Sequence, residues 1–124
     1  MKDLILTGTD HTPEVNFSCD GNLKISGVSI PENVNKFYDQ LLTWIDQFEK
    51  SSPKSLTLTI DFEYINSSTL NFLLFKLFSK IISLAKNNTA LKVIWVYPKD
   101  DDDIEDMGKN MEEVLNFKFE FICK

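Results

Sequence analysis

A short polar segment, Asn66–Thr69, lies between a predicted strand and a predicted helix and is the clearest candidate for chemistry in this sequence. The first backbone N–H groups of a helix lack intrahelical acceptors, and the helix dipole places partial positive charge there. An Asn or Ser side chain at this position can cap the helix, and a hydroxyl can also carry a phosphate that the free N–H groups accommodate. The segment is therefore either a simple helix cap, formed by Asn66, Ser67 or Ser68, or a site of serine phosphorylation.

The residue pattern changes its period across this segment. Before it, apolar and polar residues alternate, as in a strand with one buried face. The predicted buried positions of this strand are Leu56, Leu58, Ile60, Phe62 and Tyr64. After it, apolar residues recur every three or four positions over residues 68–87, as on the buried side of a helix. The predicted core-facing residues of this helix are Leu70, Leu73, Leu74, Leu77, Phe78, Ile81, Leu84 and Ala85.

Two aromatic residues of this helix, Phe72 and Phe75, fall outside its predicted core-facing side. They either lie beneath an N-terminal hairpin or form an exposed apolar patch, and such patches mark protein-binding surfaces. Both lie within two turns of the serines, so a phosphate on a serine would change the charge beside any docked protein. The predicted partner-binding residues are Asn66, Thr69, Phe72 and Phe75.

Composition limits the class of protein. The chain has 124 residues, of which 43% are hydrophobic and 12% aromatic, which suits one domain with one hydrophobic core. Its net charge of −6 and pI near 4.7 disfavour binding to nucleic acids or anionic membranes, which attract clustered Lys and Arg. The sequence shows no signal peptide and no uninterrupted apolar stretch that would span a membrane, so we expect a cytoplasmic protein. Cys19 and Cys123 have no metal-ligand spacing and are expected to be free thiols.

The N-terminal part of the chain predicts strands followed by a helix. A Leu-Ile-Leu stretch near the start forms a short strand, and an Asp-Gly-Asn turn joins Val15–Ser18 and Leu23–Gly27 into a hairpin. A helix follows, with Ser29 as its cap and Glu32 completing a capping box, and it ends near Lys50. This helix is expected to lie against the sheet.

The C-terminal part adds a strand, a helix and a strand. From Val93 to Tyr97 both faces of the chain are apolar, which is typical of a strand covered on both sides. Residues 104–115 have the period of an amphipathic helix, and residues 117–121 alternate as a last strand. The predicted fold class is α/β: a single domain in which a mixed β-sheet begins with a hairpin, continues as alternating helices and strands, and packs with about three helices.

Residues that would support catalysis or ion binding are sparse. Asp61 and Glu63 share the polar face of their strand, where we expect them to contact solvent and not to act as an acid–base pair. The acidic run at 100–106 lacks the alternation and central Gly of a calcium loop, and carboxylates at a helix start are favoured by the dipole. His11 has no further ligand nearby. With four glycines and no Gly-rich phosphate loop, the sequence predicts no catalytic residue, cofactor or metal site.

Several short motifs occur in a characteristic order. They are Leu6-Thr7-Gly8-Thr9, Thr12-Pro13-Glu14-Val15, Ser29-Ile30-Pro31-Glu32-Asn33, Trp44, Tyr64-Ile65-Asn66-Ser67-Ser68, Trp95-Val96-Tyr97 and Phe117-Lys118-Phe119. Their order and spacing together resemble the SiaC family of bacterial regulatory phosphoproteins. The resemblance extends over nearly the whole chain, so residues 1–124 are interpreted as a single SiaC-like domain.

The resemblance implies a non-enzymatic protein that acts through partners. SiaC-type proteins are phosphorylated by a dedicated kinase and dephosphorylated by a metal-dependent phosphatase of the PP2C type. Their unphosphorylated form binds and activates a diguanylate cyclase, which implies a role in cyclic di-GMP signalling and biofilm formation. The modified hydroxyl of the family directly follows the Asn, which implies Ser67, although Ser stands here where Thr is commonest. Anti-sigma-factor antagonists, which have a similar fold and similar partner switching, would instead imply Ser68.

Two other functions agree with the same sequence. The chain could antagonise an anti-sigma factor, with the same phosphorylation switch and a different partner. It could instead be a structural module, in which the serines only cap the helix and Phe72 and Phe75 form a permanent homodimer interface.

Overall fold

A computed structural model describes residues 1–124, and its strands form one six-stranded sheet in the order in which they occur along the chain. The strands are β1 Leu4–Leu6, β2 Glu14–Phe17, β3 Asn22–Ser29, β4 Ser55–Ile65, β5 Ala90–Tyr97 and β6 Glu120–Cys123. β1, β2 and β3 pair in antiparallel fashion, whereas β3, β4, β5 and β6 pair in parallel. The predicted α/β class with a mixed sheet is confirmed.

The turn of the β2–β3 hairpin depends on Gly21. Its φ is +100°, a conformation that residues with a side chain rarely adopt. A Cβ at this position would lie 2.5 Å from the carbonyl oxygen of Ser55. This close approach lets the Gly21 carbonyl accept a hydrogen bond from the Thr57 N–H at 2.8 Å. The predicted hairpin is confirmed, and its turn docks directly on the start of β4.

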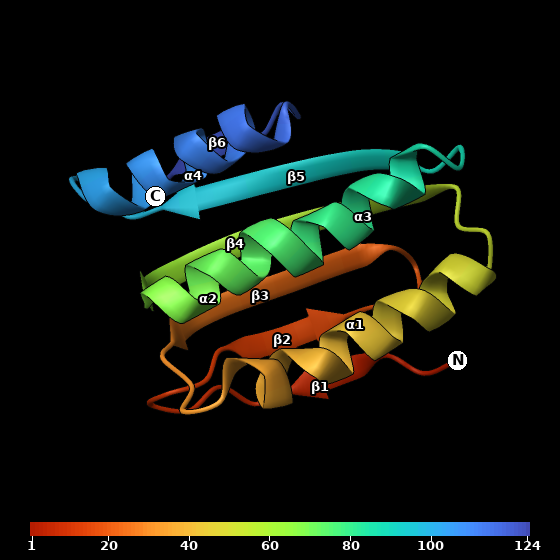
Figure 1. The fold of residues 1–124 in the computed structure, drawn as a ribbon, viewed down its shortest axis with the longest axis horizontal. Coiled ribbons are helices and arrows are strands. Elements are labelled where there is room, and N and C mark those ends of the chain that lie inside the picture. The colour runs from red at the N-terminus through yellow and green to blue at the C-terminus, as the bar shows by residue number, and fades with distance from the viewer.

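Three helical segments connect the parallel strands and lie on the same face of the sheet (Figure 1). The first segment is α1 Val34–Lys50. The second is a continuous helical run that consists of α2 Ser67–Phe72, the π-helical turn η1 Leu73–Leu77 and α3 Phe78–Ala85. The third segment is α4 Asp102–Leu115. Parallel neighbours need crossover connections, and crossovers of one hand between strands in sequential order place every helix on one side. The other face of the sheet therefore carries no helix.

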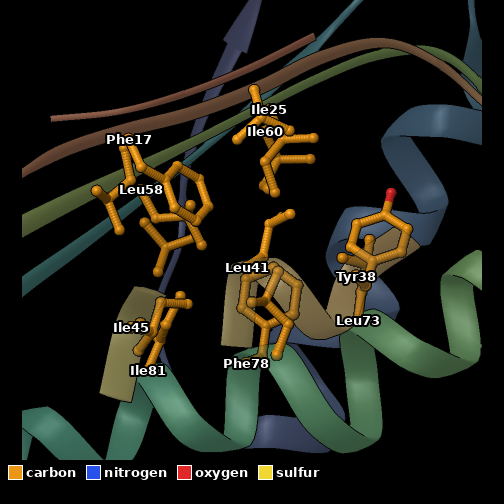
Figure 2. Close-up of a cluster of buried hydrophobic side chains, with 14 of the residues drawn as sticks. Phe17, Ile25, Tyr38, Leu41, Ile45, Leu58, Ile60, Leu73, Phe78 and Ile81 are labelled. Carbon is orange, nitrogen blue, oxygen red and sulfur yellow. The ribbon is translucent and has the colours of Figure 1, made fainter. Parts of the chain in front are cut away.

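The hydrophobic core lies between this face of the sheet and the helices (Figure 2). Ile60 from the sheet faces Leu41 of α1, whereas Ile81 of α3 lies beside Ile45 of α1, and all four are fully buried. Fully burying one such side chain contributes about 1.5–3 kcal/mol. Towards β6, the Trp95 indole N–H donates to the carbonyl of Ile104 at 2.9 Å, which attaches α4 to the same core.

β5 is not covered on both faces, so the prediction from its apolar run is wrong. Val93 and Trp95 are buried beneath the helices, but Ile94 and Val96 face the opposite side of the sheet and are only half-buried. Most parallel sheets have helices on both faces. Here the strands are adjacent in sequential order, so every crossover helix lies on the same side of the sheet. The apolar residues of β5 do not indicate that only one face carries helices.

The last strand begins later than predicted. β6 starts at Glu120, whereas the alternation indicated a strand from Phe117. The backbone N–H of Phe119 donates to the Glu112 carboxylate at 2.7 Å, so it does not pair with β5. Phe119 is nevertheless buried in the core, as its apolar side chain requires.

α1 also begins later than predicted. Its N-cap is Asn33, whose Oδ1 accepts from the Lys36 N–H at 3.0 Å. Ser29, the predicted cap, is instead the last residue of β3 and is fully buried. The capping box with Glu32 is therefore wrong, because β3 continues through the residue that would have opened it.

The run Ser67–Ala85 has the length and composition that a membrane span requires, with 19 residues and a mean hydropathy of 1.3. Asn71, Lys76 and Lys80 interrupt the run, in agreement with the expectation that no uninterrupted apolar stretch of this length occurs. Leu73, Leu77 and Ile81 of this run are fully buried against the rest of the protein. A helix that packs on a sheet and between other helices needs many apolar residues, and its composition then approaches that of a span.

A substitution at Gly108 of α4 tests how closely this helix packs on the sheet. A Cβ there would lie 2.6 Å from ring atoms of Trp95. We expect Gly108→Ala to lower the free energy of unfolding by about 1–3 kcal/mol through overpacking, although Ala favours helices more than Gly does. Urea denaturation followed by Trp fluorescence measures the change. Asn110→Ala, at an exposed position of α4, is the control, and equal stability of the two variants would contradict the tight contact.

Candidate functional site

Asn66 caps the helix that begins with α2. Its Oδ1 accepts hydrogen bonds from the Thr69 N–H at 2.9 Å and from the Ser68 hydroxyl at 3.2 Å. Asn is among the most favourable N-cap residues. Of the three candidate caps, Asn66 therefore has this role, and neither serine is needed for it.

Both candidate phosphorylation sites lie on the surface. Ser67 and Ser68 are exposed, so their hydroxyls are accessible to a modifying enzyme. The Ser68 hydroxyl is bonded to Asn66, whereas the Ser67 hydroxyl makes no hydrogen bond within the protein. Ser67 is also the first helical residue, in the turn whose backbone N–H groups lack intrahelical acceptors.

Thr69 is fully buried, and its hydroxyl belongs to a network beneath the serines. The Ser29 hydroxyl is 2.9 Å from Thr69 Oγ1 and 2.7 Å from the Tyr38 hydroxyl. The Ser29 carbonyl accepts from the Asn66 N–H at 3.1 Å and from the Thr69 hydroxyl at 3.3 Å. We call Ser29, Tyr38 and Thr69 the hydroxyl network. Because burial removes Thr69 from the surface, its predicted place on the partner-binding surface is wrong.

Tyr38 connects the hydroxyl network to α1. Burial raises the pKa of the Tyr38 hydroxyl above its ordinary value, and the hydrogen bond to Ser29 opposes this to a smaller extent. The hydroxyl therefore stays protonated at neutral pH and can both donate and accept. The Tyr38 ring packs beside Phe72 of α2, with 5.1 Å between ring centroids.

Tyr64 is exposed because β4 contains a bulge. The pairing of β3 with β4 shifts by one residue between Gly27, opposite Phe62, and Val28, opposite Tyr64. An extra residue in one strand reverses the alternation of its side chains. Tyr64 is 57% exposed, so its predicted buried position is wrong. A glycine inside a strand often marks a bulge, so Gly27 of β3 is the local sequence feature that indicates the shift in pairing.

The two aromatic residues of the predicted surface have different environments. Phe75 is 69% exposed, but Phe72 is only 5% exposed. α1 lies beside α2, and the contact between Tyr38 and Phe72 covers the latter. The expectation of a shared exposed patch is therefore wrong for Phe72, because it allowed for the sheet and the hairpin as neighbours but not for a second helix.

The π-helical turn η1 follows directly after Phe72. In a π turn the hydrogen bond spans five residues, which adds a residue to the turn and shifts the direction of the side chains around it. Phe75 and Lys76 lie in this turn, so their directions differ from those of a regular α-helix. A helical period of 3.6 residues per turn does not reveal such a turn in the sequence. Such turns are frequent at functional sites.

A groove of about 290 Å³ separates the start of α1 from α2, and we call it the α1–α2 groove. Its lining residues are Val34, Asn35, Ser68, Asn71, Phe72, Phe75 and Lys76. Within it, Lys76 Nζ donates to Asn35 Oδ1 at 3.2 Å and lies 5.2 Å from the centre of the Phe72 ring. One candidate serine, an exposed aromatic side chain and a lysine thus share one concave surface.

Two of the carboxylates that the sequence singled out, Asp61 and Asp101, have structural partners. Asp61 Oδ1 accepts from Lys124 Nζ at 2.6 Å. In the acidic run, Asp101 caps α4 by accepting from the Ile104 N–H at 3.1 Å. Ion pairing and helix capping therefore account for both. The structure brings together no group of three or more His, Cys, Asp or Glu side chains that would hold a metal ion.

The site thus combines exposed serines at a capped helix start with an adjoining groove on a mixed α/β fold. The sequence pattern of the SiaC family regulatory phosphoproteins matches residues 6–124. The chain therefore belongs to the SiaC family, as the resemblance of its motifs predicted.

Solved structures of this family have the same fold. SiaC of Pseudomonas aeruginosa matches with a TM-score of 0.86 at 22% identity, over 100% of this chain and 98% of that chain. SiaC in complex with the diguanylate cyclase SiaD, of which it is the activator, comes from the same organism and matches with a TM-score of 0.90 at 21% identity, over 98% of this chain and 100% of that chain. An uncharacterised protein of Pseudomonas aeruginosa strain UCBPP-PA14 is 22% identical over 120 residues, 96% of this chain and 94% of its own length.

Removing the Tyr38 hydroxyl tests whether the hydroxyl network holds the serine segment. Tyr38→Phe keeps the ring on Phe72 but loses the hydrogen bond to Ser29, so we expect about 0.5–1.5 kcal/mol lower stability. Urea denaturation measures the stability, and NMR-detected hydrogen exchange should show faster exchange at Thr69. Tyr64→Phe, at an exposed position, is the control. Unchanged exchange at Thr69 in Tyr38→Phe would show that the network does not hold the segment.

Proposed function

We propose that this chain is a non-enzymatic bacterial signalling protein of the cytoplasm, switched by phosphorylation of Ser67, with Ser68 as the alternative acceptor. Its unphosphorylated form binds and activates a diguanylate cyclase, and it thereby acts in cyclic di-GMP signalling and the control of biofilm formation. One observation supports this most directly: in a chain of the regulatory phosphoprotein family, Ser67 is exposed at a helix start that another residue, Asn66, already caps.

The structure favours Ser67 over its neighbours as the acceptor. Its hydroxyl makes no hydrogen bond, so a kinase would not have to break one. The Ser68 hydroxyl bonds to the capping side chain of Asn66, and the Thr69 hydroxyl is buried in the hydroxyl network. Modification of Ser67 therefore leaves both the cap and the network intact.

A phosphate on this residue would change the surface more than the fold. It adds about −1.5 to −2 charges and three acceptor oxygens. The free N–H groups and the dipole at a helix start favour such an anion, so the domain itself tolerates it. An apolar or acidic partner surface would instead be opposed by desolvation and like-charge repulsion. Phosphorylation is therefore expected to end partner binding without unfolding the protein.

A diguanylate cyclase is the proposed partner class because SiaC of Pseudomonas aeruginosa forms a complex with the cyclase SiaD as its activator. We further propose a dedicated kinase that phosphorylates Ser67 and a metal-dependent PP2C-type phosphatase that removes the phosphate. The surface for these partners contains Asn66, the two serines and Phe75, with Phe72 in the wall of the adjoining groove.

Mass spectrometry of the native protein tests the switch itself. We expect one phosphate on the peptide that contains Ser67 and Ser68, and fragmentation that retains the phosphate should place it on Ser67. Treatment with a PP2C-type phosphatase should remove it. A phosphate on Ser68 would move the site by one residue. Absence of the phosphorylated form from both growing and starved cells would contradict the switch.

Substitutions at Ser67 separate a switch from a passive surface position. Because Ser67→Asp adds a negative charge, we expect it to retain about tenfold less cyclase than wild type in a pull-down from the native organism. Ser67→Ala should retain the wild-type amount. Ser79→Asp, at an exposed position further along the same helical run, controls for added charge alone. Equal retention by Ser67→Ala and Ser67→Asp would count against a switch at this residue, and no cyclase with wild type would count against the partner.

A further inference from the structure

We infer that the α1–α2 groove is the docking site for a segment of the partner protein that carries an apolar anchor residue and a nearby carboxylate, and that Lys76 pairs with this carboxylate. The inference rests on the proposed function, because it describes how the same surface recognises its partner. It concerns binding of the unphosphorylated protein and can be tested separately from the switch.

The groove has the size and walls that suit an apolar side chain. Its volume of about 290 Å³ lies just below the roughly 300–1,000 Å³ of typical small-molecule sites. Half-buried Val34 and buried Phe72 form apolar walls, and Phe75 stands exposed beside them. Aromatic side chains, Phe among them, are enriched in protein–protein interfaces.

The charge of the groove favours an acidic partner segment. Acidic residues outnumber basic residues 19 to 13 in the chain, yet the lining contains one lysine and no carboxylate. Lys80, on the next turn of the helical run, pairs with Asp46, whereas Lys76 takes part in no ion pair. The amide of Asn35 and the ring of Phe72 hold the ammonium of Lys76 in place without neutralising it. A partner carboxylate would meet a cation that is already oriented.

The positive charge of Lys76 also explains how phosphorylation opposes docking of an acidic segment. Ser68 lines the groove, and Ser67 is its neighbour at the helix start. A phosphate on either serine places negative charge at the edge of the groove that receives the partner carboxylate. The helix start accepts the anion, but the groove next to it loses its preference for acidic segments.

Site-specific cross-linking identifies the occupant of the groove. Phe75 is replaced by photoreactive p-benzoylphenylalanine, and the cross-linked peptide from irradiated cells of the native organism is sequenced. We expect one partner segment with an apolar residue and an Asp or Glu within four positions of it. Val114 on α4, which is 66% exposed against 69% for Phe75, is the matched control position. No adduct above this control, or a segment without a carboxylate, would overturn the proposal.

Binding of the identified segment, as a synthetic peptide, tests Lys76. We expect Lys76→Gln to weaken binding about three- to fivefold and to reduce its dependence on salt, while Lys76→Arg keeps the affinity. Lys86→Gln, at an exposed lysine without an ion pair at the end of the same run, should bind like wild type. Lys76→Glu should regain affinity for a peptide whose carboxylate is changed to Lys. Equal affinities of Lys76→Gln and Lys86→Gln would overturn the pairing.

These measurements use unphosphorylated protein, so two failures can be told apart. A groove that binds an acidic segment, in a protein that is never phosphorylated in cells, would contradict the proposed switch alone. A phosphorylated Ser67 together with equal binding of both lysine variants would contradict the groove proposal alone. Thermal unfolding of each variant, with a midpoint within a few degrees of wild type, confirms that the fold is retained.

Discussion

The carbonyl and hydroxyl groups of Ser29, at the end of β3, are the contacts on which the rest of the candidate site depends. The carbonyl accepts from Asn66 and Thr69, and the hydroxyl connects Thr69 to Tyr38. A buried polar group without a partner costs about 1–3 kcal/mol, and no buried side-chain N or O of this protein lacks one. The need to pair these buried polar groups therefore determines where β4 ends and the helical run begins, relative to both the sheet and α1.

The inward contacts of this segment leave its outward side chains exposed to solvent. Asn66 closes the helix and Thr69 anchors it, while Ser67 and Ser68 between them are exposed. Two candidate functional residues therefore lie between two structural residues within four positions. A change of charge on the exposed hydroxyls acts on the surface and on what docks there. The cap and the buried network hold the helix start in place beneath it.

Sequence patterns predicted the features that depend on near neighbours. The Asp-Gly-Asn turn, the β2–β3 hairpin and the mixed α/β architecture follow from turn chemistry and periodicity, and the structure confirms them. The patterns failed where a distant segment decides the outcome. Ser29 looks like a helix cap until β3 is seen to continue through it, and Tyr64 looks buried until a bulge reverses the alternation. Phe72 looks exposed on a helical wheel that omits α1.

By itself, the sequence determined the order of strands and helices, the acidic charge and the polar segment between β4 and the helical run. Its motifs also determined the family, because their order and spacing are linear properties of a chain. Only the tertiary structure decided which hydroxyls are buried, which aromatic side chain is exposed and that Lys76 lies in a groove with Ser68. The reason is that burial arises from packing between distant segments, as between Ser29 and Thr69, which are 40 residues apart. No local period contains that information.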